Sequence, residues 1–165
     1  MKMKKLFLLS GPPACGKSSF AKKNLGINDE WISRDNVRFA IIGENEDYFS
    51  HEEEVFETFV CYINQMLEKS EVENIYIDAT HLNKASRNKV IKKIKKDNVN
   101  EINCVIFQVP LGVCLERNES REGRTKVPKS VIRRMYYSHT MPEEDEKFDN
   151  IIIVDEYLRS NLYNT

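Results

Sequence analysis

The chain has 165 residues, of which 41% are hydrophobic and 31% charged, with a formal net charge of −1 at pH 7. This length and composition are ordinary for a globular protein, so we expect residues 1–165 to form a single domain with a substantial core. The near-neutral charge excludes a global attraction to nucleic acid, so a partner of that kind would need a local basic patch.

Several features of the sequence bear on its location. The basic and apolar start, MKMKKLFLLS, has an apolar run too short for a signal peptide, and no segment reaches membrane-spanning length. The four cysteines lack C-x-x-C spacing and are expected to be small buried residues in a reducing compartment. We therefore predict a cytoplasmic protein without a membrane partner, and the sequence leaves its oligomeric state open.

The N-terminal segment predicts a strand followed by a phosphate-binding loop. The apolar run Leu6–Leu9 indicates a buried strand over 5–9. The next residues, GPPACGKS at 11–18, fit the pattern G-x-x-x-x-G-K-[ST], and an amphipathic helix over 17–24 is predicted directly after the loop. Backbone N–H groups of such a loop and the positive helix N-terminus suit phosphate oxygens. The strand before and the helix after argue against a chance Gly/Pro turn.

This loop predicts a nucleoside triphosphate site. Lys17 should reach the β- and γ-phosphates, and the Ser18 hydroxyl should coordinate Mg²⁺. We therefore expect ATP and Mg²⁺ as cofactors. The residues assigned to nucleotide binding here are Gly11, Pro12, Ala14, Cys15, Gly16, Lys17, Ser18 and Ser19.

A second strand is predicted at Trp31–Ser33, and the sequence RDNVR follows it. Ligands of open α/β sheets bind beyond the C-terminal ends of the strands, so Asp35 is placed to accept a proton from an attacking hydroxyl. Arg38 lies one helical turn further on and could bind a phosphate of the acceptor. The structural alternative is a helix capped by Asp35 or Asn36, with a solvated Arg38.

The central part of the chain predicts a loop, a long helix and a third strand. Residues 43–50 are acidic and turn-rich, whereas the apolar residues of 51–69 recur at the spacing of a core-facing helix. The strand predicted at 74–78 ends in Asp78, where a carboxylate can orient the waters of a bound Mg²⁺. The alternative for this aspartate is a plain turn residue. Asn83 is expected to cap the next helix.

The last third of the chain predicts two strands, at 102–109 and 150–154, with helices at 111–118 and after Pro128. The polar segment over about 117–128, RNESREGRTKVP, carries three arginines. It suits a lid that closes over ATP and supplies positive charge to the transferring phosphoryl group. The alternative is a solvated loop. Strands alternating with helices indicate an α/β protein: a three-layer P-loop NTPase fold with a parallel sheet.

The segments GPPACGKSS, SRDNVR, DATHLN and RNESREGRTKVP together resemble the kinase domain of the polynucleotide 5′-hydroxyl kinases. They occur in the order of that family and span nearly the whole chain. The resemblance implies an adenylate-kinase-like fold and ATP-dependent phosphorylation of a nucleic-acid 5′-OH. It further implies that Lys17 and Ser18 bind the phosphates and Mg²⁺, that Asp35 is the general base, and that Arg38 contacts the phosphate next to the 5′-OH.

The resemblance also implies roles further along the chain. Asp78 supports the metal site. Arg117 and Arg121 belong to an R-N-x-x-R lid motif and bind the nucleotide, with Arg121 also acting on the transferring phosphoryl group. Gly123 and Arg124 are placed differently from the family's pattern, which leaves Arg124 without an assigned role.

Three functions remain open on the sequence. The first is a kinase of RNA or DNA 5′-OH ends in nucleic-acid repair, with such ends as the partner. The second is a P-loop kinase of a small-molecule alcohol, such as a nucleoside, sugar or antibiotic. The third is a nucleotide-binding module without catalysis, which the combination of Lys17, Ser18, Asp35 and Arg121 disfavours. The pair Arg34 and Arg38 favours the first, because it suits an acceptor that already carries phosphate.

Overall fold

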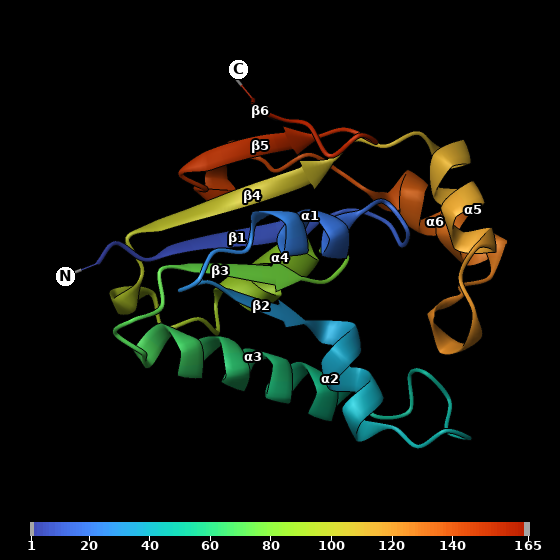
Figure 1. The fold of residues 1–165 in the computed structure, drawn as a ribbon, viewed down its shortest axis with the longest axis horizontal. Helices are drawn as coiled ribbons and strands as arrows, with labels where there is room; N and C mark the ends of the chain where they lie inside the picture. Colours follow the sequence, from blue (N-terminus) through green and yellow to red (C-terminus); the bar gives the residue numbers. More distant parts are fainter. Residues whose placement is uncertain (1, 164–165) are drawn as a thin grey trace.

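The computed structural model describes residues 2–163, which form a six-stranded sheet in the order β2-β3-β1-β4-β5-β6 (Figure 1). The strands are β1 (Lys5–Ser10), β2 (Glu30–Ser33), β3 (Asn74–Asp78), β4 (Glu101–Phe107), β5 (Asn150–Val154) and β6 (Ser160–Leu162). The first five are parallel, as predicted, and β6 pairs antiparallel with β5. The sequence predicted no strand after the one at 150–154, because a three-residue exposed strand has no apolar pattern to reveal it.

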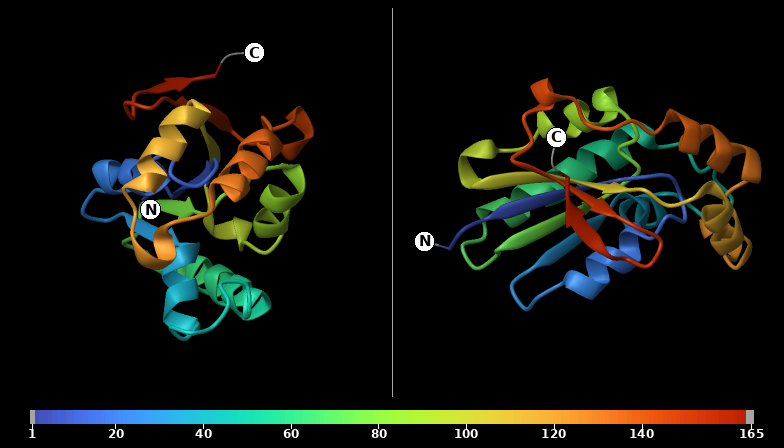
Figure 2. Two further views of the ribbon diagram at one scale, coloured as in Figure 1. Left: turned by 90° about the vertical axis from the view of Figure 1, so that its right-hand side faces the viewer. Right: turned by 90° about the horizontal axis from the view of Figure 1, so that it is seen from above.

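Helices cover both faces of the sheet, which confirms the three-layer prediction (Figure 2). They are α1 (Lys17–Asn24), α2 (Arg34–Ile41), α3 (Glu52–Glu68), α4 (Lys84–Ile91), α5 (Leu111–Glu119) and α6 (Lys129–Ser138). Helices α3 and α4 pack on one face, and α1, α5 and α6 contribute to the core on the other. No helix within residues 2–163 is both long and apolar enough to cross a membrane.

The central strand β1 shows why the sequence folds into layers. Its side chains alternate between the two cores: Leu6 and Leu8 join the core under α3 and α4, while Phe7 and Leu9 join the core under α1 and α5. The predicted stripe of α3 is confirmed, because its apolar side chains are buried against the sheet. A strand buried on both faces needs apolar residues at every position, which is what the run Leu6–Leu9 provides.

The helix caps agree with the sequence at one position and correct it at another. Asn83 caps α4 as predicted, in a reciprocal capping box with Ser86. Helix α2, however, is capped by Ser33, whose Oγ accepts a hydrogen bond from the backbone N–H of Asn36 (3.2 Å). The proposed cap at Asp35 or Asn36 is wrong, because the chain passes from the last residue of β2 into the helix without a loop. The side chain of Asp35 is therefore free to serve another purpose.

The C-terminal ends of the five parallel strands meet at one edge of the sheet, where α2, α5 and the loop after β1 lie (Figure 1). Residue pairing places Asp78 beside both Leu9 of β1 and Ser33 of β2. The loop that follows β1 and the helix that follows β2 thus start on either side of the Asp78 carboxylate. This convergence brings distant sequence motifs to one place.

Candidate active site

The loop between β1 and α1 requires its two glycines. Gly16 has a φ of 106°, and a Cβ there would lie 3.1 Å from Cδ2 of Leu158 and 3.4 Å from an Arg117 guanidinium nitrogen. A Cβ on Gly11 would lie 2.7 Å from the Cys15 sulfur and 3.0 Å from Cβ of Phe107. Gly11 therefore has no room for a side chain, and Gly16 is needed for its left-handed backbone conformation.

Lys17, the first residue of α1, is buried and extends its side chain into this loop. Its Nζ donates hydrogen bonds to the carbonyl oxygens of Gly11 (2.9 Å) and Pro12 (2.8 Å) and lies 3.6 Å from the sulfur of Cys15. Burial raises the pKa of the Cys15 thiol, an effect that the nearby ammonium opposes. The lysine thus presents a positive charge inside the loop, held by neutral groups that an incoming phosphate can replace.

Ser18 and Asp78 form a pair beside the loop. The Ser18 hydroxyl donates to Oδ2 of Asp78 (2.7 Å), and the indole N–H of Trp31 donates to the same oxygen (2.9 Å). A hydroxyl next to a carboxylate is the hard-oxygen donor set that Mg²⁺ prefers, so these residues fit the metal expected from the sequence. Within residues 2–163 no cluster of three or more His, Cys, Asp or Glu side chains could hold a metal. The nucleotide and water would therefore have to supply most of the ligands.

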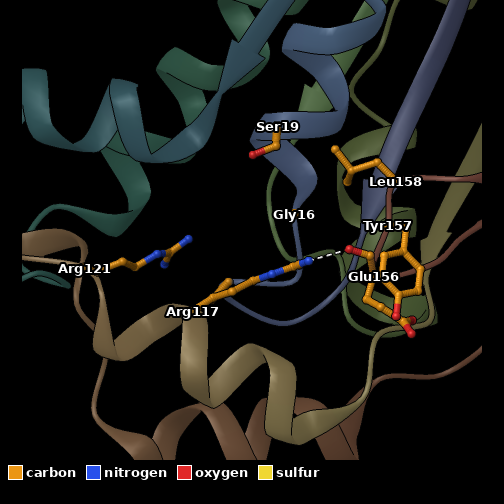
Figure 3. A pocket seen from close by; sticks show the side chains of 8 residues that line it. Gly16, Ser19, Arg117, Arg121, Glu156, Tyr157 and Leu158 are labelled. Carbon is orange, nitrogen blue, oxygen red and sulfur yellow. Dashed lines mark hydrogen bonds between the residues drawn. The ribbon is translucent and has the colours of Figure 1, made fainter.

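A cavity of about 450 Å³ opens beside the same loop (Figure 3). Its lining comes from the loop and α1, from α5 and its C-terminal end, and from the turn between β5 and β6; the residues are Ala14, Gly16, Ser19, Arg117, Arg121, Glu156, Tyr157 and Leu158. Figure 3 shows Arg117 extending toward Glu156, with Arg121 entering from the other end of the pocket. Five of the nucleotide-binding residues expected from the sequence thus line one concave site: Ala14, Gly16, Ser19, Arg117 and Arg121.

Arg117 connects three parts of the chain. Its guanidinium donates to the carbonyl oxygen of Cys15 (3.2 Å) in the loop and to that of Glu156 in the β5–β6 turn. Arg121 donates to the carbonyl oxygen of Thr125 (3.2 Å) and otherwise faces the cavity. These contacts bring both arginines of the R-N-x-x-R motif to the site, whereas closure of the segment over 117–128 as a lid stays a prediction.

The β5–β6 turn is a part of the site that the sequence analysis missed. Leu158 adopts a φ of 61°, and the Asp155 carboxylate accepts hydrogen bonds from the backbone N–H groups of Tyr157 (2.9 Å) and Arg159 (3.0 Å). The only signal in the sequence is an apolar pair, Tyr157 and Leu158, after the last strand. The turn reaches the loop because β5 lies next to β4, a fact of strand order rather than of local pattern.

A second group of charges lies at the start of α2. Arg38 is almost fully buried, with 5% of its side chain exposed, whereas Asp35 is 57% exposed. The Arg38 guanidinium donates to Oδ1 of Asp35 (2.6 Å), to the Tyr48 hydroxyl (2.6 Å) and, with two nitrogens, to Oε1 of Glu52 (2.9 and 2.7 Å). Asp35 and Arg38 therefore contact each other directly, and the solvated Arg38 of the structural alternative is wrong.

Tyr48 and Glu52 are functional candidates that the sequence analysis did not single out. The Tyr48 hydroxyl donates to Oδ1 of Asp35 (2.5 Å), and burial, followed by the charge of Asp35, raises the pKa of Tyr48 strongly, so the phenol stays protonated. Glu52 also accepts from Arg34 (3.2 Å). Burial lowers the pKa of Arg34, and Glu52 opposes that shift. The negative charges of Asp35 and Glu52 thus neutralise the positive charges of Arg34 and Arg38.

Two histidines near the loop are structural. Burial lowers the pKa of His81 to about 3, and its Nδ1–H donates to the carbonyl oxygen of Leu9 (2.7 Å). Burial also lowers the pKa of His139 to about 4, and its Nε2 lies 3.0 Å from the Ser10 hydroxyl. Both rings are therefore neutral at physiological pH, and they brace the end of β1 from which the loop starts. Of the cysteines, Cys61 is exposed, which corrects the expectation that all four are buried.

Comparison with known proteins identifies the family. Residues 6–142, which include every motif described above, match the family of AAA domains. The chain belongs to this AAA domain family. Its P-loop domain is of the kinase type, so the resemblance seen in the motifs is confirmed at the level of a P-loop kinase domain.

Solved structures with the same fold include kinases of different substrates. A chain of the Pnkp1/Rnl/Hen1 RNA repair complex superposes with a TM-score of 0.68 at 23% identity, over 84% of this chain and 44% of that chain. A fungal RNA kinase gives a TM-score of 0.64 at 16% identity, over 93% and 75% of the two chains. A sugar kinase from Janibacter sp. gives 0.56 at 15% identity, over 94% and 86%.

These likenesses establish the fold. The chain spans less than half the length of the RNA repair chain with which it superposes. At identities of this size the substrate does not follow from the similarity, and RNA kinases and sugar kinases occur side by side among the solved structures.

Proposed function

We propose that this domain transfers the γ-phosphoryl group of ATP to the 5′-OH end of RNA or DNA. The observation that carries the proposal is the contact between Asp35 and Arg38 (2.6 Å) at the end of β2, next to the strand that ends in Asp78. A carboxylate that can accept a proton and a guanidinium that can bind phosphate stand together where an acceptor alcohol would meet the nucleotide. A 5′-OH nucleic-acid end offers a hydroxyl and a neighbouring phosphate.

The loop after β1 and the adjoining cavity would bind ATP. Lys17 would exchange its bonds to Gly11 and Pro12 for oxygens of the β- and γ-phosphates. Ser18 and Asp78 would hold Mg²⁺, which supplies neutralisation of the charge on the phosphates when bound. Tyr157 and Leu158 offer apolar surface for the nucleoside part of ATP at the other end of the cavity.

Residues at the start of α2 would bind and activate the acceptor. Asp35 would take the proton of the attacking 5′-OH as the oxygen–phosphorus bond forms and the bond to the β-phosphate oxygen breaks. Arg121, which faces the cavity, would neutralise charge on the moving phosphoryl group. Exposure of Asp35 leaves its second carboxylate oxygen accessible to an acceptor.

The acceptor phosphate would have to compete for Arg38. The Arg38 guanidinium donates four hydrogen bonds, to Asp35, Tyr48 and Glu52. A phosphate would therefore replace one of these partners rather than bind a free cation. Arg34 donates a single hydrogen bond within residues 2–163, to Glu52, and has donors to spare. We therefore assign acceptor-phosphate binding to Arg38 and Arg34 acting together.

The second candidate function is phosphorylation of a small-molecule alcohol. The observation that favours it is the balance of charge around Arg38, because a site whose two guanidinium groups are neutralised by Asp35 and Glu52 can also accept an uncharged substrate. Both candidates use the same base and the same nucleotide site. They differ only in what Arg34 and Arg38 bind.

One experiment separates the two. The protein is incubated with γ-labelled ATP and Mg²⁺, and label transfer is measured to single-stranded RNA and DNA with 5′-OH ends and to a panel of nucleosides, sugars and sugar acids. The same oligonucleotides with 5′-phosphate ends serve as controls. Transfer to 5′-OH ends at a kcat/KM well above that of every small alcohol supports the proposal. Transfer to a small alcohol alone would overturn it in favour of the second candidate.

A further inference from the structure

Three aromatic side chains lie together beside the acceptor side of the site. Phe39 belongs to α2, while Tyr48 and Phe49 belong to the loop over 42–51 that joins α2 to α3. The ring centroids of Phe39 and Tyr48 are 6.1 Å apart and those of Tyr48 and Phe49 are 4.7 Å apart, both in edge-to-face geometry. We call these three residues the aromatic cluster.

The aromatic cluster is not needed for the core. None of its members belongs to either of the two groups of buried side chains on the faces of the sheet, and Phe49 is 57% exposed. An exposed phenylalanine beside a second partly exposed aromatic ring gains little from burial in the folded protein. Its flat face is available to a ligand.

The position of the cluster is set by the acceptor residues. Tyr48 donates to the Asp35 carboxylate (2.5 Å), and the Arg38 guanidinium carbon lies 4.1 Å from the centre of the tyrosine ring. The loop is also braced from within: the Asp47 carboxylate accepts from the backbone N–H of Phe49 (3.2 Å) and the Asp47 carbonyl oxygen accepts from that of Ser50 (3.0 Å). The exposed ring is thereby held at a defined place next to the proposed base.

Arg124 adds a cation to this cluster. Its guanidinium carbon lies 4.5 Å from the centre of the Phe39 ring, so the segment between α5 and α6 contacts α2 through this side chain. Guanidinium groups and aromatic rings both stack on nucleobases. Arg124, to which the sequence assigned no role, is therefore part of the same surface.

We propose that the aromatic cluster and Arg124 bind the nucleobase of the 5′-terminal nucleotide of the acceptor, with Phe49 as the stacking ring. This inference rests on the proposed function, since it requires a nucleic-acid end at Asp35. The charge of the loop favours a base over a run of phosphates, because Glu44, Glu46 and Asp47 precede Phe49 and would repel a phosphodiester backbone. All four bases can stack on an aromatic ring, so this site would bind a terminal base without selecting among the four.

The test compares two single-stranded oligonucleotides that differ only at the 5′-terminal nucleotide. One carries a base, and the other is abasic with the same 5′-OH. For the parent protein we expect kcat/KM to be at least about fivefold higher with the base, the lower end of what base–aromatic stacking contributes. In Phe49→Ala this preference should fall toward one through loss with the base-bearing substrate alone, while Phe49→Trp should retain it.

The control is Tyr62→Ala, which removes an exposed aromatic ring from α3 and should leave the preference intact. Thermal unfolding of each variant checks that the fold is unchanged. An equal loss on both substrates in Phe49→Ala, or a parent protein that does not distinguish them, overturns the base site and leaves the 5′-end kinase standing. A parent protein that phosphorylates neither substrate overturns the proposed function and the base site together.

Discussion

Replacing Asp35 by Asn is the sharpest test of the proposed chemistry. The amide keeps the size of the carboxylate and an oxygen that can still accept from Arg38 and Tyr48, but it cannot take a proton from an attacking hydroxyl. Because Ser33 rather than Asp35 caps α2, the change leaves the helix N-terminus intact. The ion pair with Arg38 involves a carboxylate that is 57% exposed, so we expect unfolding free energy to fall by less than about 1 kcal/mol.

The effect on the reaction should be far larger. General-base catalysis contributes about 10²–10⁴-fold, or roughly 2.7–5.5 kcal/mol of transition-state stabilisation. We therefore expect Asp35→Asn to bind ATP and Mg²⁺ with the affinity of the parent protein and to lose at least about 100-fold in kcat/KM for the acceptor. Titration with a fluorescent ATP analogue measures the nucleotide affinity, and initial rates of label transfer give kcat/KM for the acceptor.

A matched control is Glu57→Gln, which neutralises an exposed carboxylate of α3 that makes no ion pair within residues 2–163. It should transfer phosphate at the parent rate. If Asp35→Asn also works within threefold of the parent rate, Asp35 serves only as a structural partner of Arg38 and Tyr48. The base would then have to be sought elsewhere, with Asp78 as the next candidate.

Four further changes test other parts of the site. Lys17→Ala should abolish transfer to every acceptor, because it removes the charge inside the loop; turnover near that of the parent protein would show that the loop is not the catalytic phosphate site. Arg38→Ala should reduce kcat/KM for oligonucleotides more than any transfer to unphosphorylated nucleosides, and equal losses on both would favour the small-molecule candidate. Gly16→Ala should weaken ATP binding at least about tenfold in a nucleotide titration, because its Cβ would press on Leu158 at a φ of 106°, while unchanged affinity would show that the loop can relax. The pKa of His81 is about 3 in the folded chain and about 6.5 when unfolded, so its contribution to the free energy of unfolding is complete above pH 6.5. This contribution is lost as the pH falls toward 3, at about 1.4 kcal/mol per pH unit. Chemical unfolding at pH 7 and pH 5 measures the loss, and equal stability at both pH values would contradict it.

Most of the nucleotide site could be predicted from the sequence because its parts are local. Gly16 ends the short loop after β1, and Lys17 and Ser18 begin α1, so their placement depends on the loop glycines and on the adjoining strand and helix. The alternation of apolar runs also predicted the parallel sheet and its layers, since side-chain period is a property of each segment by itself. The capping of α4 by Asn83 followed from the same kind of local rule.

The acceptor side could be predicted only in part. The residues Asp35 and Arg38 stand out in the sequence, yet their partners do not, because Tyr48 lies in a loop that looks merely acidic and exposed. Glu52 reads as an ordinary first residue of α3. Their contacts depend on the way α3 packs against α2, which brings residues 10 and 14 positions after Arg38 to its guanidinium group.

The order of the strands in the sheet determined contacts between distant segments that no local sequence pattern predicts. The sequence by itself determined a P-loop, a parallel α/β fold and the chemical groups of a kinase, because each is written in a contiguous segment. Only the tertiary structure placed Trp31 on the Asp78 carboxylate and the β5–β6 turn against Gly16. Those contacts arise because β2 lies beside β3 and β5 beside β4. Strand order is chosen by the packing of whole layers, and no single segment of the chain carries that information.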